Sequence, residues 1–214
     1  MLSVVILDDG EPNVIKLTYE NLHKETKQIE DSELIVAKDW FDALSVVKNK
    51  YVCFVEPDCL VSSGYFSSQM GLFKKNPFMR KLAMLSSATG VNNWANRVYG
   101  YKLGGNYTDG IIPVTDKTSS AVHPVQMGYL PGSIVRVEML KTALKTLKID
   151  NCRGTNYVAL SAKLSIAFWQ QGDGNRVHIN PNTTYVTTED YVNDICQVTL
   201  KPGSLVEMFK KEVI

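Results

Sequence analysis

The chain has 214 residues, of which 44% are hydrophobic and 21% charged, so it can bury a full core as one domain. Its 23 basic and 22 acidic residues give a formal net charge of +1, which provides no basic excess for nucleic acid or an anionic membrane. No run approaches the roughly 20 apolar residues of a membrane span, so we expect none.

The cysteines and the N-terminus indicate the compartment. Cys53, Cys59, Cys152 and Cys196 include no Cys-x-x-Cys pair, which argues against a zinc site. The segment Met1–Asp8 has no basic region and reaches a carboxylate too early for a secretory signal peptide. We therefore expect a cytoplasmic protein with reduced cysteines.

The first strand is predicted at Leu2–Leu7, an apolar segment rich in β-branched residues. It is followed by two carboxylates, Asp8 and Asp9. Pro12 then suits the first position of a helix that continues to about residue 27. The same order, a buried strand followed by acidic residues, recurs further along the chain.

A second strand is predicted at Ser32–Ala37, followed by Asp39, and a short helix at Trp40–Asn49. A third strand is predicted at Tyr51–Val55. The order strand, helix, strand, helix, strand is typical of a doubly wound α/β domain with a parallel sheet.

The third strand is the centre of the prediction. It is apolar on both faces, so it belongs in a sheet that is covered on both sides. Pro57 cannot donate to a sheet ladder, so the strand should end there and present Glu56 and Asp58 at its carboxyl end. Ligands of open α/β sheets bind at that edge. Two such carboxylates can share a hard cation with phosphate oxygens, although an acidic turn is the simpler interpretation of the triplet alone.

Acidic residues thus follow three predicted strands that should meet at one edge of the sheet: Asp8 and Asp9, Asp39, and Glu56 with Asp58. Carboxylates gathered in this way repel one another unless a cation or a donor-rich ligand is bound. No Gly-x-Gly-x-x-Gly follows the first strand and no Walker lysine motif occurs. A dinucleotide dehydrogenase and a P-loop phosphotransferase are therefore disfavoured.

The rest of the chain alternates further helices and strands with one irregular stretch. Residues 89–126 carry many glycines and the aromatics Trp94, Tyr99, Tyr101 and Tyr107, which is typical of a lid or binding loop, or of loop anchors packed on the domain. The elements predicted around it are a helix at 64–75, a strand at 81–86, helices at 137–148 and 155–171, strands at 176–180 and 184–187, and a helix at 205–213.

Three segments together resemble the glycosyltransferases of the GT-A fold, which use nucleotide-diphospho-sugars. Tyr51–Asp58 is similar to their strand and Asp-x-Asp motif, and Gly128–Leu140 to a Gly-rich strand before an Arg-containing helix start. Leu160–Pro181 resembles the next helix, turn and strand. The resemblance covers roughly residues 2–188. It implies an α/β GT-A (nucleotide-diphospho-sugar transferase) fold with a mostly parallel central sheet and helices on both faces.

The resemblance also implies roles for the two central carboxylates. Asp58 would ligate a Mn²⁺ or Mg²⁺ that bridges the diphosphate of the donor, and would be the catalytic metal ligand. Glu56 stands where the family has the first Asp of its motif, and would hold the ribose or support the metal. It is one methylene longer than the residue it replaces, which is a departure from the family pattern.

Other residues receive roles by the same comparison. Asp39 would contact the uracil, and Leu7, Asp8 and Asp9 would line the nucleotide pocket. His178 is a candidate third metal ligand, because some relatives use a late histidine in this way, although in its alternating segment it can face either side of a strand.

The chain is similar in particular to the small N-terminal glycosyltransferase domain encoded by chlorella viruses. This implies transfer of glucose or rhamnose from a UDP-sugar to a glycan acceptor, in the cytoplasm of the host cell. We expect the chain to consist of a nucleotide-binding half at about 1–88, an acceptor-side half at about 89–200 and a C-terminal helix at 201–214. The resemblance also implies that the chain is one domain of a longer polypeptide.

One departure concerns the catalytic base. Inverting members of the family place a carboxylate before the helix that here begins at Thr155, and this sequence has none there. Asp150 and Asp173 are possible substitutes as bases. The alternative, which we favour, is a retaining transferase in which the leaving phosphate takes the proton. A catalytically silent binding module stays open, as does a sugar nucleotidyltransferase, although the acidic turn after the first strand suits triphosphate poorly.

Overall fold

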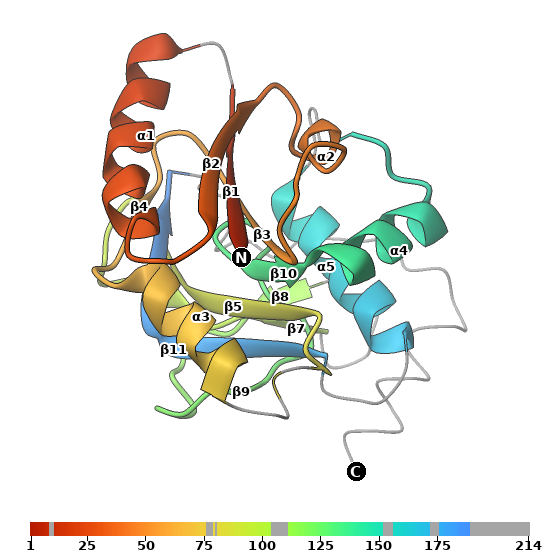
Figure 1. Ribbon diagram of the computed structural model, residues 1–214. Coiled ribbons are helices and arrows are strands. Elements are labelled where there is room, and N and C mark those ends of the chain that lie inside the picture. Colours follow the sequence, from red (N-terminus) through yellow and green to blue (C-terminus); the bar gives the residue numbers. More distant parts are fainter. Residues whose placement is uncertain are drawn as a thin grey trace.

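The computed structural model describes residues 1–8, 11–75, 79, 81–103, 111–151, 156–171 and 176–188. The chain alternates strands and helices up to α3 and then adds a strand-rich second part (Figure 1). The elements are β1 (Leu2–Leu7), α1 (Pro12–Thr26), β2 (Ser32–Ala37), α2 (Trp40–Ala43), β3 (Tyr51–Val55), β4 (Leu60–Val61), α3 (Tyr65–Lys75), β5 (Met84–Val91), β6 (Arg97–Val98), β7 (Tyr101–Leu103), β8 (Ile111–Pro113), β9 (His123–Pro124), β10 (Ile134–Arg136), α4 (Val137–Leu147), α5 (Tyr157–Gln170) and β11 (Val177–Thr187).

The described residues form a central mixed sheet with the strand order β2-β1-β3-β10-β5-β11-β4. β6 and β9 pair at its margins with β5 and β11, and β7 and β8 form a separate hairpin. β2, β1 and β3 are parallel, and β10 runs against both β3 and β5. β11 is parallel to β5. The carboxyl ends of β1, β2, β3, β5 and β11 therefore lie at one edge of the sheet.

Helices cover both faces of this sheet. α1 and α3 contact each other on one face, and α4 and α5 pack together on the other, where α2 also lies against β1 and β2 (Figure 1). All five residues of β3 are buried, as the apolar run on both faces predicts. Buried side chains from every helix join the strands in one continuous core.

The structure confirms the fold class and most of the predicted elements. β1, β2 and β3 have the predicted bounds, and α1, α3, α4 and α5 differ from prediction by one or two residues at their ends. The two short strands predicted at 176–180 and 184–187 are one strand, β11, interrupted by a register shift between Asn180 and Thr184. The predicted C-terminal helix lies outside the described residues.

Three predictions were wrong in detail. The helix predicted at Trp40–Asn49 ends at Ala43, after which most amide bonds reach back only three residues, as in turns. The strand predicted at 81–86 begins at Met84 and extends to Val91, into the stretch predicted to be irregular. That stretch also contains β6, β7, β8 and β9. No helix in the described part of the chain has the length and apolar character that a bilayer crossing requires.

Candidate active site

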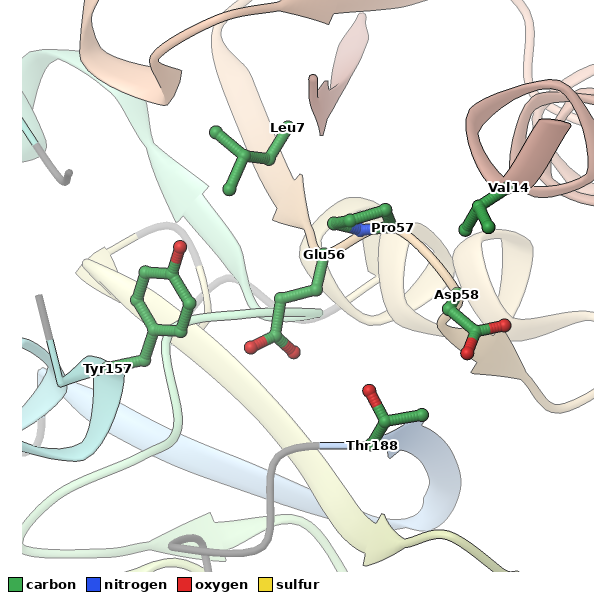
Figure 2. A pocket seen from close by; sticks show the side chains of 7 residues that line it. All are labelled: Leu7, Val14, Glu56, Pro57, Asp58, Tyr157 and Thr188. Carbon is green, nitrogen blue, oxygen red and sulfur yellow. The ribbon is translucent and has the colours of Figure 1, made fainter. Parts of the chain in front are cut away.

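A pocket of about 290 Å³ lies at the carboxyl edge of the sheet, where the sequence predicts a ligand site. Its walls come from the ends of β1, β3 and β11 and from the first turns of α1 and α5 (Figure 2). The lining residues are Leu7, Val14, Glu56, Pro57, Asp58, Tyr157 and Thr188. The pocket thus joins segments from both halves of the chain around the predicted carboxylates.

Asp58 is the exposed carboxylate of the pocket. Its backbone has a φ of 61°, in the left-handed region that Asp tolerates better than most residues. The N–H of Asp58 donates to Oγ1 of Thr18 on α1 at 3.0 Å, which ties this turn to the helix. The turn after Pro57 therefore holds the Asp58 side chain at the rim, where solvent and ligands reach it.

Glu56 is the buried carboxylate, only 4% exposed. The hydroxyl of Tyr129 donates to its Oε1 at 3.1 Å, and the hydroxyl of Tyr185 donates to its Oε2 at 3.0 Å. The main-chain N–H of Glu56 donates in turn to the Tyr185 hydroxyl at 3.0 Å. Figure 2 shows the Glu56 carboxylate directed between Tyr157 and Thr188, and that of Asp58 directed elsewhere.

The phenol of Tyr185 stays protonated, so it remains a hydrogen-bond donor. Burial raises its pKa well above the usual value, and the neighbouring Cys59 and Glu56 raise it further. Burial also raises the pKa of the Cys59 thiol to about 12. A neutral phenol beside Glu56 satisfies the buried carboxylate without a second charge.

The residues of this pocket fit a hard divalent cation that shares its coordination with a phosphate ligand. No group of three or more His, Cys, Asp or Glu side chains that could hold a metal ion occurs within the described ranges. Mg²⁺ in particular is commonly held by one or two carboxylates plus substrate phosphates and water. Asp58 supplies such a carboxylate at the rim, and both oxygens of Glu56 already accept hydroxyls.

The predicted nucleotide-binding residues are found in several places. Leu7, Glu56 and Asp58 line the pocket. Asp8 instead lines a neighbouring open groove of about 560 Å³ between α1 and β2. Asp39 is buried, and its carboxylate caps α2 by accepting the N–H of Phe41 at 2.8 Å. Asp9 lies outside the described residues.

His178 is not brought to the pocket. It stands near the start of β11, whereas Thr188 of the pocket follows the end of that strand. In register with β5, His178 and Thr187 lie opposite Leu85 and Val91, six residue rises or about 20 Å apart. Burial, together with His123 on the paired strand, lowers the pKa of His178 to about 4.

The candidate bases are not brought to the pocket either. Asp150 is exposed beyond the end of α4, accepts a hydrogen bond from the amide of Asn151, and is not a lining residue. Asp173 lies outside the described residues. At the start of α5, the residues that the structure describes are Asn156, which caps the helix through Ala159, and Tyr157.

Five residues of the site were missed by the sequence analysis: Val14, Tyr129, Tyr157, Tyr185 and Thr188. Tyr129 and Tyr185 are 73 and 129 residues away from Glu56 along the chain, and only the tertiary fold brings them to it. Tyr157 opens α5 and packs against Trp40, with ring centroids 4.7 Å apart. The position of Tyr157 near the start of a predicted helix was the sequence signal that could have marked it as a site residue.

Comparison with known proteins establishes the fold. No protein-family model and no curated protein sequence matches the chain. Among solved structures, that of S. aureus TarS 1-349 matches with a TM-score of 0.52 and 11% sequence identity, over 87% of this chain and 60% of that one. A longer structure of S. aureus TarS matches with a TM-score of 0.46 and 11% identity, over 89% and 37% of the two chains. The chain thus spans less than two thirds of the TarS chains, and its mixed α/β architecture is the GT-A fold.

Proposed function

We propose that the protein is a metal-dependent glycosyltransferase that moves a sugar from a UDP-sugar to a glycan acceptor. The observation that carries this proposal is the pocket at the carboxyl edge of a GT-A sheet, with Asp58 at its rim and Glu56 at its floor. Its volume of about 290 Å³ suits part of a nucleotide sugar. Glucose and rhamnose are the sugars to test first, because the sequence resembles transferases that use them.

Five of the seven lining residues have a task in this proposal. Leu7 and Val14 offer apolar surface to the nucleoside, and Tyr157 offers an aromatic face. Asp58 is the residue that would hold a Mn²⁺ or Mg²⁺ ion together with the donor diphosphate. Such an ion offsets the charge that builds on the leaving diphosphate. Glu56 accepts hydrogen bonds and is held in place for a ligand hydroxyl.

We favour retention of configuration at the transferred sugar. An inverting enzyme needs a base that takes the acceptor proton. Neither Asn156 nor Tyr157, at the described start of α5, carries a carboxylate, and Asp150 is absent from the pocket lining. In a retaining reaction the leaving phosphate takes that proton. The anomeric configuration of the product, measured by NMR, distinguishes the two courses.

The same observation favours a second candidate function, a catalytically silent module that binds a nucleotide sugar. Such a module keeps the pocket and the affinity for UDP but never cleaves the bond between UDP and the sugar. The fold alone does not separate the two, because one scaffold hosts several activities.

Release of UDP from a panel of UDP-sugars, with Mn²⁺ or with EDTA, separates these functions. Many transferases slowly hydrolyse their donor, so an acceptor is not required for this test. We expect metal-dependent release from the wild type and none from Asp58→Ala. Tight UDP binding without release from any donor, even with glycan acceptors added, would instead identify the silent module.

A further inference from the structure

We propose that Tyr129 and Tyr185 are positioning residues that fix the Glu56 carboxylate on the pocket floor, where it accepts a hydroxyl of the bound sugar nucleotide. This inference rests on the proposed function for the identity of the ligand. It assigns a role to two tyrosines outside the Asp-x-Asp-like motif. The argument follows from three sets of contacts around Glu56.

The first set holds Glu56 at three points. Each carboxylate oxygen accepts one tyrosine hydroxyl, from Tyr129 at 3.1 Å and from Tyr185 at 3.0 Å. The backbone N–H of Glu56 donates to the same Tyr185 oxygen at 3.0 Å. The Tyr185 hydroxyl therefore links the backbone N–H of Glu56 to the carboxylate of the same glutamate. This arrangement leaves the side chain little freedom to turn toward Asp58 at the rim.

The second set fixes Tyr185 itself. Its ring lies on the backbone of Gly132, where an added Cβ would come within 2.5 Å of the ring. The Gly132 N–H donates to the carbonyl of Phe54 in β3 at 2.7 Å, and its carbonyl accepts the hydroxyl of Tyr65. Gly132 is thus anchored to β3, the strand that Glu56 follows directly. The ring and the carboxylate that it supports are held by the same strand.

The third set fixes Tyr129. The carbonyl of Tyr129 accepts the hydroxyl of Ser133, and the next residue, Leu130, donates its N–H to Ser161 of α5 at 2.7 Å. The Tyr129 side chain is 1% exposed. The segment that carries Tyr129 and packs against the Tyr185 ring is therefore held by β3 through Gly132 and by α5 through Leu130, which is the form of support that a rigid binding group needs.

Glu56 borders the ligand space despite its low exposure. It lines the pocket, and its carboxylate is directed between Tyr157 and Thr188 (Figure 2). A carboxylate has about four lone-pair sites, so an oxygen that accepts one hydroxyl is able to accept a second. A fixed, acceptor-only group there favours a hydroxyl donor such as those of ribose or hexose. Loss of either tyrosine hydroxyl would let the carboxylate move away from that position.

The test uses Tyr129→Phe, Tyr185→Phe and the double variant, which keep the rings and remove only the hydroxyls. Tyr51→Phe is the matched control, because Tyr51 is also buried but begins β3 at the opposite edge of the sheet. Calorimetry with UDP-glucose and Mn²⁺ gives the Kd of each variant, alone and combined with Glu56→Gln. Thermal unfolding of the same set gives the melting temperatures without ligand.

We expect the double tyrosine variant to bind UDP-glucose about tenfold more weakly, the loss typical of one charge-assisted hydrogen bond. Combined with Glu56→Gln, it should weaken binding no further than Glu56→Gln alone. Binding equal to the wild type, or effects that add to that of Glu56→Gln, would overturn the inference.

If the wild type binds no UDP-sugar, the proposed function has failed, and the ligand half of this inference is overturned with it. The melting temperatures then test separately whether the tyrosines support the Glu56 side chain. Tyr185→Phe should lower the melting temperature less in the Glu56→Gln background than in the wild type. An equal decrease in both backgrounds would show that the tyrosine does not act through Glu56.

Discussion

Gly132 lies directly against the ring of Tyr185: a Cβ on Gly132 would meet ring atoms Cγ and Cδ2 at 2.5 Å. Its φ of 76° is also one that side chains with a Cβ adopt at a cost. Two independent requirements therefore exclude any residue but glycine. The contact links β11 with the segment that precedes β10. These two parts of the chain are distant in sequence and adjacent at the pocket.

We predict that Gly132→Ala lowers the free energy of unfolding by about 3 kcal/mol or more, from backbone strain and the clash with Tyr185 together. The matched control is Gly71→Ala in α3, where an added Cβ would meet nothing within 4 Å. There we expect a gain of about 0.5–1 kcal/mol, because alanine is the better helix former. Urea unfolding measures both. A decrease in the free energy of unfolding of less than about 1 kcal/mol for Gly132→Ala would contradict the packing of the Tyr185 ring on Gly132.

The thiols of Cys53 and Cys59 should resist alkylation in the folded protein. Both are buried, and burial raises the pKa of Cys59 to about 12 and that of Cys53 well above its usual value. At pH 8 neither forms the reactive thiolate. Iodoacetamide followed by peptide mass spectrometry should find both unmodified in buffer and modified in urea. Labelling of Cys59 in the native protein would mean that the turn after Glu56 is not packed as described.

His178 should make the protein less stable in acid. Its folded pKa of about 4 lies below the ordinary value of 6.5, because it is partly buried and faces His123. As the pH falls from about 6.5 toward 4, the unfolded chain takes up this proton before the folded one, so stability falls. His178→Gln removes this uptake. Its melting temperature should decrease less than that of the wild type between pH 7 and 4.5, and parallel curves would contradict the assignment.

The strands and their acidic ends could be predicted from sequence because the signals are local. Tyr51–Val55 is an uninterrupted apolar run, and Pro57 marks its end, so Glu56 and Asp58 were placed at the correct edge of the sheet. The short strands β6 to β9 carry two or three residues each, too few for a periodic pattern.

The supports of the site could not be predicted in the same way. The sequence alone gives Glu56 and Asp58 equivalent chemistry, but the structure buries one among tyrosine hydroxyls and exposes the other. That difference depends on β11 lying beside β5, a pairing with no local signal. For Asp39 the pattern predicts a ligand contact, and the structure adds a contact that the sequence analysis did not predict, the hydrogen bond that caps α2.

Binding of UDP to the wild type and to Asp58→Asn, by calorimetry with Mn²⁺ and with EDTA, tests the central claim most directly. Asp58→Asn keeps the size and the turn preference of the residue but removes the charge that a cation requires. We predict that the wild type binds UDP much more tightly with Mn²⁺, and that the variant loses this metal-dependent gain. No binding of UDP, or a metal-dependent gain that survives in Asp58→Asn, would contradict a diphosphate–metal site at the end of β3.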